Sequence, residues 1–239
     1  MKYVLVDALN LFFRARHAIP KANDPWTKLG SCLHILITSI NKAMKDTDGD
    51  HVVICLEGRS WRKDVYAPYK RNRIAKREEM TAHEQEEDAV FFEAYNDICD
   101  FFADKTACTV LRSPVAEADD LIARWISLHP DDNHVIISSD TDFYQLVNSR
   151  VAQYNGVASQ WITVDGVFNE KLKPVIDKKT GEQKHIGEPG YYLFEKCIRG
   201  DSADNIFSAY PGARKKGSKN KVGIMEAYDD REKRGYHWN

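Results

Sequence analysis

Residues 2–15 read KYVLVDALNLFFRA, in which a short apolar run ends at Asp7. Similar apolar and β-branched runs occur at residues 51–56, 107–111 and 134–137, and helical patterns lie between the runs. Strands that alternate with helices are typical of a parallel sheet. The sequence therefore predicts an α/β fold, with a mostly parallel sheet flanked by helices.

Apolar residues at helical spacing predict the helices that cover this sheet, and we interpret their aromatic side chains as core. The three stripes are Leu33, Leu36, Ile37, Ile40 and Met44; Phe91, Tyr95, Ile98 and Phe102; and Leu121, Ile122, Trp125 and Leu128. After about residue 151 the pattern changes. Runs 151–154 and 160–164, on either side of an Asn-Gly turn, predict a β-hairpin, and a short helix is expected over 191–198.

The composition is that of an ordinary globular protein, with 239 residues, 43% hydrophobic and 29% charged. The five cysteines are scattered and never spaced as CxxC, which argues against a disulfide framework or a structural zinc site and fits a reducing cytoplasm. No window approaches the roughly 18 apolar residues of a membrane span. We expect a protein that is neither exported by a signal peptide nor membrane-spanning.

The charges are segregated along the chain although the net charge is only −2. Residues 59–77 carry eight basic residues against one acid, and residues 78–100 carry nine acids and no Lys or Arg. A second basic group contains Arg214, Lys215, Lys216, Lys219 and Lys221. A nucleic-acid-binding domain usually has a strongly positive net charge, and the net charge of this chain is not positive. Such sorting of like charges nevertheless indicates charged partners.

Carboxylates follow three of the predicted strands, where ligands of open parallel sheets bind. They are Asp7, Glu57, and Asp140 with Asp142. Acids also open a predicted helix and stand in the segment RGDSADN; these are Glu117, Asp119, Asp120, Asp201 and Asp204. Each alone is explained by helix capping or a turn. Together they would repel one another unless cations lay among them, and oxygen-only ligands favour Mg²⁺ or Mn²⁺.

Five motifs in order then resemble the 5′-nuclease superfamily of flap endonucleases and 5′→3′ exonucleases, and most closely the phage-type enzymes called phage ribonuclease H. The motifs are VDALNLFFRA from Val6, SWRKDVYAPYKRNR from Ser60, EADDLIA from Glu117, SSDTDFYQLV from Ser138 and IRGDSADNI from Ile198. The resemblance implies a PIN-like, Rossmann-like nuclease domain with a helical arch that admits a single-stranded 5′ end. It implies domains at residues 1–155, with the arch at about 58–90, and at 156–239.

The resemblance also assigns the site residues. It implies two divalent ions, Mg²⁺ with Mn²⁺ as substitute, which activate a water and stabilise the attacking and leaving oxygens of a phosphodiester. Asp7, Glu117, Asp119, Asp120 and Asp140 would lie nearest one ion, and Asp142, Asp201 and Asp204 nearer the second. Glu57 stands where the family usually has Asp, so its contact with metal, direct or through water, is open. Arg62, Lys70 and Arg73 would act as catalytic cations on the scissile phosphate.

Further residues are expected to bind DNA. Trp61, Tyr66 and Tyr69 are interleaved with the cations of the arch and are candidates for stacking on unpaired bases, beside Lys63 and Arg71. Residues 211–227, with the second basic group, resemble a degenerate helix-hairpin element that grips duplex backbone. The chain ends soon after this element, whereas phage-type relatives continue with further helices, so a fragment, a truncated gene or a short variant is expected.

The function implied is a structure-specific 5′ nuclease that removes RNA primers and 5′ flaps in DNA replication. The expected partners are DNA with a 5′ flap or RNA primer, and a single-strand-binding protein or sliding clamp; no membrane is involved and a monomer is expected. The expected location is the cytoplasm, that of the infected bacterium if the phage resemblance holds. Two alternatives stay open: a PIN-type ribonuclease, and a catalytically impaired DNA-binding or replication-scaffold protein of the same fold. A haloacid-dehalogenase-like phosphatase would need Asp where Leu9 stands.

Overall fold

The computed structural model describes residues 1–18, 25–209 and 224–229. The chain divides into two compact units, the first formed by residues 1–61 and 80–185 and the second by residues 62–79 and 186–239. All five cysteines are free thiols. Among the described residues, no helix has the length and apolar character needed to cross a membrane.

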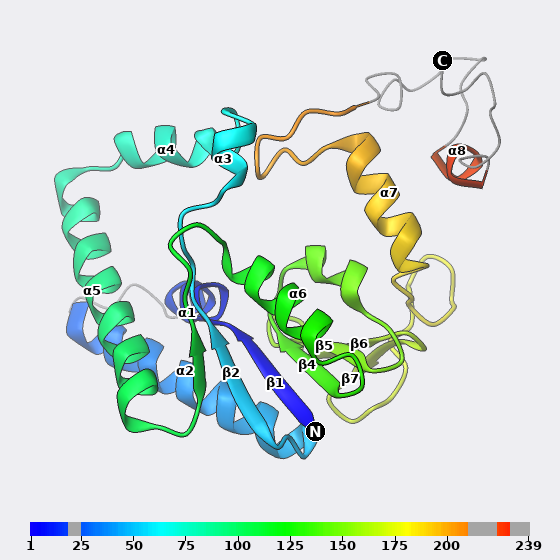
Figure 1. The fold of residues 1–239 in the computed structure, drawn as a ribbon, viewed down its shortest axis with the longest axis horizontal. Helices are drawn as coiled ribbons and strands as arrows, with labels where there is room; N and C mark the ends of the chain where they lie inside the picture. Colours follow the sequence, from blue (N-terminus) through cyan, green and yellow to red (C-terminus); the bar gives the residue numbers. More distant parts are fainter. Residues whose placement is uncertain (19–24, 210–223, 230–239) are drawn as a thin grey trace. The chain divides into compact units, whose positions relative to one another are not determined.

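A seven-stranded sheet forms the centre of the first unit (Figure 1). Its order is β3-β2-β1-β4-β5-β6-β7. The strands are β1 (Lys2–Asp7), β2 (His51–Cys55), β3 (Thr109–Leu111), β4 (Asn133–Ile137), β5 (Val151–Asn155), β6 (Gln160–Thr163) and β7 (Gly166–Asn169). The first five pair in parallel and the last three pair antiparallel. The expected mostly parallel α/β sheet is confirmed.

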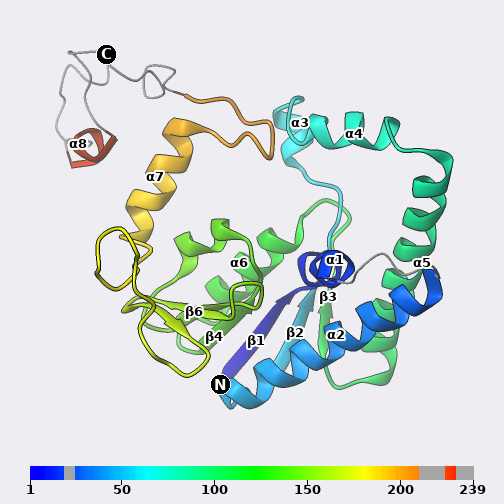
Figure 2. The same ribbon diagram turned by 180° about the vertical axis from the view of Figure 1, so that it is seen from behind.

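Helices cover both faces of this sheet because successive residues of the strands point to opposite sides. On β1, Val4 and Val6 pack towards α1 (Ala8–Ala18), α2 (Pro25–Thr47) and α5 (Ala82–Lys105), the face turned to the viewer in Figure 2. Tyr3 and Leu5 pack towards α6 (Ala118–Leu128) and the 3₁₀-helix η1 (Thr141–Leu146). Full burial of one such side chain stabilises the fold by about 1.5–3 kcal/mol.

Residues of all three predicted helical stripes pack in the core. Leu36, Phe91 and Ile122 are buried, as expected. Ile37 and Leu128, which also belong to the stripes, are 40% and 58% exposed. Ile37 follows the buried Leu36 and therefore points away from the sheet, and Leu128 is the last residue of α6.

The long helix α5 begins at Ala82, within the acidic segment 78–100. Thr81 is its N-cap and forms a capping box with Glu84, in which the Thr81 Oγ1 accepts from the Glu84 amide at 3.3 Å and Glu84 Oε2 accepts from the Thr81 amide at 2.8 Å. These bonds satisfy two amides that the first turn leaves without helical partners. The acids from Glu84 onward thus lie in a helix whose buried face carries Phe91, Tyr95 and Phe102.

The expected hairpin is confirmed as β5 and β6, and the structure extends it by β7, which the sequence analysis missed. Gly166 begins β7 with a φ of +129°, a conformation that side chains rarely adopt. The following segment returns along β7, with the Val175 amide bonded to the Val167 carbonyl and the Val167 amide to the Lys184 carbonyl. The strands after residue 155 therefore belong to the same sheet as β1.

The second unit is helical in its described part. Its helices are α3 (Arg62–Val65), α4 (Arg71–Glu78), α7 (Pro189–Arg199) and α8 (Ile224–Asp229). The expected helix over 191–198 is confirmed as α7, which starts with Pro189 in its first turn, where no helical amide is needed, and stops at Gly200, whose φ is +69°.

Candidate metal centre

Three carboxylates lie at the carboxyl edge of the sheet because β1, β2 and β4 are parallel neighbours. Asp7 is the last residue of β1, Glu57 follows β2, and Asp140 follows β4. The register places Val6 beside Ile54 on one side and Ile137 on the other, so all three strands end at nearly the same level. The three acids therefore follow neighbouring strand ends at one edge of the sheet.

Asp7 is the most buried of the three, at 9% exposure. Its Oδ2 accepts a hydrogen bond from Ser138 Oγ at 3.0 Å and its Oδ1 accepts one from the Asn10 amide at 3.3 Å. Burial raises the pKa of Asp7 to about 7; these two hydrogen bonds oppose the rise, and the charges of Glu57 and Asp140 add to it. A carboxylate held this way binds a cation strongly once ionised, because the cation removes the cost of its buried charge.

A second acidic group opens α6. Ligand oxygens of Glu117, Asp119 and Asp120 lie within 4.8 Å of one another, close enough to share one cation. Glu117 is 3% exposed and accepts a hydrogen bond from Ser60 Oγ at 2.9 Å, while its amide donates to Asp120 Oδ2 at 3.1 Å. These acids therefore cap the helix and also offer a set of all-oxygen ligands of the kind that Mg²⁺ and Mn²⁺ prefer.

Glu57 is tied to the start of the same helix. Its Oε2 accepts a hydrogen bond from the Ala118 amide at 3.1 Å. The chain has little room directly after Glu57, because a Cβ at Gly58 would lie 1.9 Å from the Ser113 carbonyl oxygen. The Glu57 side chain thus reaches the backbone at the start of α6, beside the acids that open that helix.

Asp140 and Asp142 stand at the start of η1. Asp140 caps it, accepting from the Asp142 amide at 2.9 Å, while its own amide donates to Ser138 Oγ at 3.1 Å. Beneath them, the fully buried Gln153 of β5 donates from Nε2 to the carbonyls of Ser138 and Asp140 at 2.9 and 2.7 Å. One buried amide thus fixes the backbone that carries Asp140.

The sequence analysis missed the supporting residues of this centre: Asn10, Ser60, Ser138 and Gln153. Ser60 and Ser138 open two of the motifs, and Asn10 accepts from the amide and hydroxyl of Ser139 at 3.1 and 3.0 Å. Gln153 carried one usable signal, since it is a polar residue at a buried position of an apolar strand, and such a residue needs hydrogen-bond partners.

Asp201 and Asp204 belong to the second unit. Asp201 pairs with Lys196 Nζ at 2.8 Å and accepts from the Ala203 amide at 2.7 Å, and the hydrogen bond from Lys196 is the main reason that its pKa is lowered. Asp204 pairs with Arg73 Nη2 and lies 3.8 Å from Lys70 Nζ. The expectation that these two aspartates serve a second metal stays a prediction.

The basic segment 59–77 divides into side chains of different exposure. Tyr69 is 5% exposed, with Lys70 Nζ 5.0 Å and Arg62 Cζ 6.0 Å from its ring centroid. Its ring supports these cations and has little surface left for a base, which argues against the stacking role expected for it. Tyr66 is half-buried, and Trp61 of the first unit is 47% exposed. Lys63 and Arg71 are exposed.

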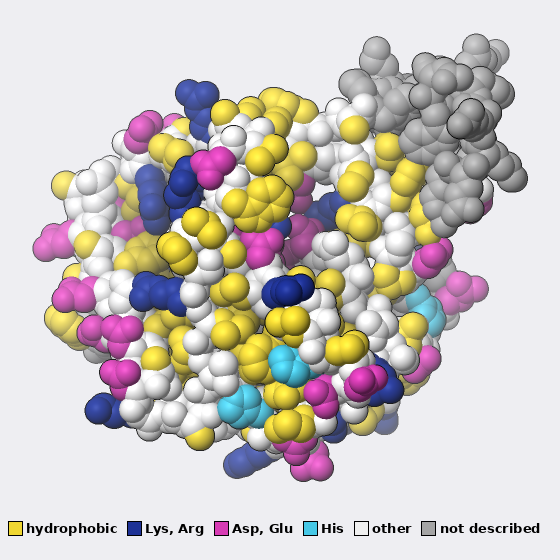
Figure 3. Space-filling model, in the orientation of Figure 1, with side chains coloured by type: hydrophobic (Ala, Val, Ile, Leu, Met, Phe, Trp, Pro, Cys, Tyr) yellow, Lys and Arg dark blue, Asp and Glu magenta, His cyan; other side chains and the backbone are white. Residues whose placement is uncertain are grey.

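The second basic group, Arg214, Lys215, Lys216, Lys219 and Lys221, lies outside the described residues, as does most of the expected helix-hairpin element. On the face drawn in Figure 3, Lys and Arg side chains are interspersed with acidic and hydrophobic ones. Figure 3 therefore shows no continuous basic field among the described residues of that face.

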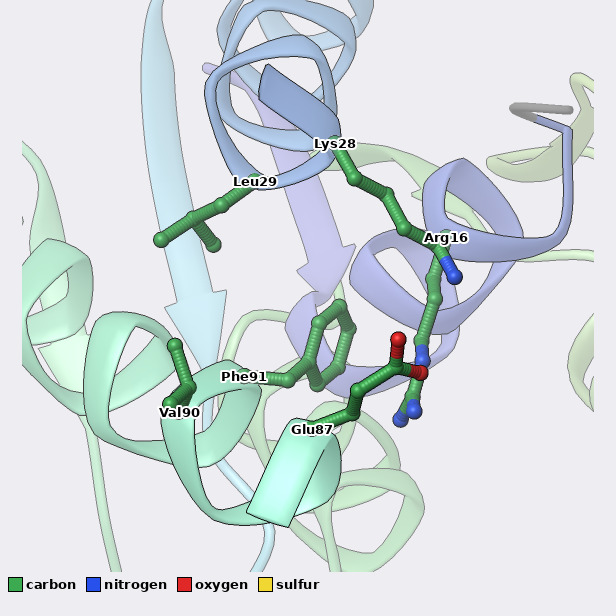
Figure 4. A pocket seen from close by; sticks show the side chains of 6 residues that line it. All are labelled: Arg16, Lys28, Leu29, Glu87, Val90 and Phe91. Carbon is green, nitrogen blue, oxygen red and sulfur yellow. The ribbon is translucent and has the colours of Figure 1, made fainter. Parts of the chain in front are cut away.

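A pocket of the first unit lies apart from these acids (Figure 4). It is lined by Arg16, Lys28, Leu29, Glu87, Val90 and Phe91. The Arg16 guanidinium forms an ion pair with Asp88 and lies 4.5 Å from the Phe91 ring centroid. Its charge is balanced by that neighbour, so the pocket is a packing feature between α1, α2 and α5.

Residues 2–173 match the family model of the 5′-3′ exonuclease N-terminal resolvase-like domain. A 5′-3′ exonuclease of Mycoplasmopsis pulmonis is 28% identical over 222 residues, which are 92% of this chain and 65% of that protein. The flap endonuclease Xni of a Shewanella strain is 23% identical over 231 residues, covering 95% of this chain and 75% of the relative. The chain thus spans about two thirds to three quarters of these relatives.

Solved structures show the same fold. The 5′-exonuclease of T5 with bound zinc superposes with a TM-score of 0.68 at 21% identity, covering 97% of this chain and 75% of that one. The flap endonuclease of bacteriophage T5, in a pseudo-enzyme-product complex with DNA and metal ions, gives a TM-score of 0.63 at 22% identity and the same coverage. The mostly parallel sheet with flanking helices is therefore shared with these proteins.

Proposed function

Because this chain belongs to the 5′-3′ exonuclease family with the N-terminal resolvase-like domain, we propose that it is a divalent-metal-dependent 5′ nuclease. Its substrates are the phosphodiesters of 5′ flaps and RNA primers. The observation that supports this most directly is the set of acids at the carboxyl ends of β1, β2 and β4 together with the acidic start of α6.

The residues present fit divalent cations on two grounds. The donors are all carboxylate oxygens, and the pKa of Asp7, raised by burial to about 7, indicates an acid whose charge is costly without a cation. Asp7, Glu117, Asp119, Asp120 and Asp140 would hold one ion, and Asp142, Asp201 and Asp204 would serve a second. Glu57 would contact metal directly or through water. Bound Mg²⁺, or Mn²⁺ in its place, supplies activation of water and charge neutralisation at the phosphate.

The cations of the second unit contact the substrate phosphate. Lys70 and Arg73 neutralise the negative charge of the phosphodiester, and so does Arg62, which like Lys70 lies near the Tyr69 ring. Lys63, Tyr66 and Arg71 bind the single-stranded 5′ end, and the basic group from Arg214 to Lys221 binds duplex backbone without regard to sequence.

The biological setting proposed is removal of RNA primers and 5′ flaps during DNA replication, in the cytoplasm of a bacterium or of a phage-infected host. The enzyme acts as a monomer. A single-strand-binding protein or a sliding clamp brings it to the replication fork. The domains proposed are the nuclease domain at residues 1–155, with its arch at about 58–90, and a duplex-binding region from residue 156 onward.

The test is cleavage of three 5′-labelled substrates: a flap duplex, an RNA-primed DNA duplex and a plain single strand. Each is incubated with Mg²⁺, with Mn²⁺ or with EDTA. Metal-dependent cleavage near the flap junction and loss of the RNA primer are expected. Flap binding without cleavage under either metal would instead favour the scaffold protein, and Glu57→Asp would then test whether the longer side chain is the cause. Preferred cleavage of single-stranded RNA would favour the PIN-type ribonuclease.

A further inference from the structure

The second unit brings together two segments that are about 130 residues apart in sequence. Residues 66–73 carry Lys70 and Arg73, and residues 201–207 carry Asp201 and Asp204. The two segments run antiparallel, since Asn205 contacts Pro68 while residues 202 and 203 contact Asn72. The backbone amide of Lys70 donates to the Asp204 carbonyl at 2.9 Å at the middle of this contact.

Two asparagine side chains hold the segments together. Asn205 Nδ2 donates to the Pro68 carbonyl at 2.8 Å. Asn72 Nδ2 donates to the carbonyls of Ala203 and Ser202 at 3.1 and 3.4 Å. Because both acceptors of Asn72 are carbonyl oxygens, only its amide nitrogen can face them, which fixes the orientation of the side chain. Each segment therefore uses one amide to bind the backbone of the other.

The backbone conformation at the contact depends on these bonds. Lys70 has a φ of +54° and Asn205 a φ of +57°, both in the left-handed region. Asn adopts this region readily, whereas Lys does so only where its surroundings fix it. At Lys70 the surroundings are the bond to the Asp204 carbonyl and the neighbouring Asn72 contacts. The direction in which the Lys70 side chain leaves the chain is thus set by the 201–207 loop.

Charged side chains of the two segments also form ion pairs at the contact. Asp204 lies within ion-pair distance of both Lys70 and Arg73, and the Asp204 side chain is only 18% exposed. A shift of the loop would move the aspartate and the two cations relative to one another. The Nδ2 atoms of the two asparagines donate to backbone carbonyls. Their amides are uncharged, so they cannot neutralise a phosphate or a metal ion.

We propose that Asn72 and Asn205 are positioning residues, which lock the loop carrying Asp201 and Asp204 onto the segment carrying Lys70 and Arg73. Cations that neutralise a phosphate and acids that hold a metal must keep a fixed spacing, and these two amides set it within this unit. The consequence for catalysis rests on the proposed nuclease function; the consequence for the backbone does not.

The first experiment measures single-turnover flap cleavage and flap affinity for Asn72→Ala in wild-type and Lys70→Ala backgrounds. Asn96→Ala, an exposed asparagine of α5, is the matched control. We expect Asn72→Ala to slow cleavage about tenfold, because small displacements of catalytic groups are costly, with affinity changed less than about twofold. In the Lys70→Ala background the same substitution is expected to slow cleavage less than it does in wild type, since part of its effect acts through Lys70. Equal slowing in both backgrounds, or none in either, would overturn the proposal.

The second experiment separates this inference from the proposed function. Hydrogen exchange of the Lys70 amide is measured without DNA or metal in wild type, Asn72→Ala, Asn205→Gly and Asn96→Ala. Asn205→Gly removes the amide contact while keeping the left-handed backbone accessible. Exchange at Lys70 is expected to be about tenfold faster in the Asn72→Ala and Asn205→Gly variants than in wild type, and unchanged in the control. If wild type cleaves no substrate, the proposed function fails, and this exchange pattern alone decides the positioning role; unchanged exchange would refute it.

Discussion

Replacement of Asp7 by Asn is predicted to stabilise the metal-free protein at alkaline pH. Burial raises the pKa of Asp7 from 3.8 to about 7. At 1.36 kcal/mol per pH unit, this difference means that the ionised carboxylate costs the folded state roughly 4 kcal/mol above pH 7. Asn removes that charge. It also leaves the Ser138 hydroxyl facing an amide, which costs about 1 kcal/mol, so a net gain of about 3 kcal/mol is expected.

The sign of the pH dependence follows from which state holds the proton. Between pH 3.8 and about 7 the folded wild type keeps a proton on Asp7 that the unfolded chain has released. Stability of the wild type therefore falls as pH rises through this window and is constant above it. The Asp7→Asn variant has no titrating group at this position, so the gap between the two proteins narrows from about 3 kcal/mol at pH 8.5 to less than about 1 kcal/mol at pH 5.

The assay is denaturation by urea in EDTA at pH 5 and pH 8.5, followed by circular dichroism. Asp104→Asn, which removes an exposed carboxylate of α5, is the control and changes stability by less than about 0.5 kcal/mol at both pH values. Mg²⁺ stabilises whichever protein binds it in the folded state. Adding Mg²⁺ at pH 8.5 therefore stabilises the wild type more than Asp7→Asn, because the variant lacks the Asp7 carboxylate. A gap between wild type and Asp7→Asn that is the same at both pH values would refute the reasoning.

Four further predictions follow from the same geometry. Asp140→Asn abolishes metal-dependent cleavage of a labelled flap while gel-shift affinity stays within about twofold; equal loss of binding would contradict a metal role. Lys70→Ala lowers the single-turnover rate by at least about a hundredfold but the flap affinity by less than about fivefold, measured by quench-flow and fluorescence anisotropy. Gly58→Ala lowers the free energy of unfolding by more than about 2 kcal/mol in urea titrations, because its Cβ would meet the Ser113 carbonyl at 1.9 Å; an unchanged midpoint would show that the turn relaxes. His134 is 2% exposed, neither ring nitrogen has a hydrogen-bond partner among the described residues, and burial lowers its pKa, so wild type loses stability as pH falls below 6.5 and His134→Leu loses less, as thermal melts at pH 5 and pH 8 would show.

The sheet could be predicted because its strands carry strong local signals. The runs at β1, β2 and β4 are apolar on both faces, as buried parallel strands require, and acids end them abruptly. The strand β7 has a weaker signal: it has only four residues, begins with Gly166, and is stabilised by contacts with a segment up to 17 residues further on. Its pairing with β6 is local, across the turn at Asp165-Gly166, whereas the segment that returns along its other side is not marked by any local pattern.

The candidate site also has a part that the sequence predicts and a part that it does not. Acids after strands and at the start of α6 could be found from position alone, since topology decides where strand ends meet. The residues that hold them could not, because Gln153 and Asn10 act across gaps of 13 residues and 129 residues in the chain. Burial of Tyr69 could not be predicted from the sequence either. An aromatic residue between cations is equally compatible with stacking on a base and with packing against the cations.

The hydrogen-bond ladder on both sides of β1 has a consequence for how this protein can change. Since Val6 is fixed beside Ile54 and Ile137, the height of Asp7 at the sheet edge is set by main-chain pairing. One residue inserted in β1 would advance that carboxylate by about 3.3 Å and turn it to the opposite face. Insertions in the turn between β5 and β6 leave this level untouched. That turn is therefore open to variation in length, whereas the three strands that precede the acids tolerate substitution but not a change in residue number.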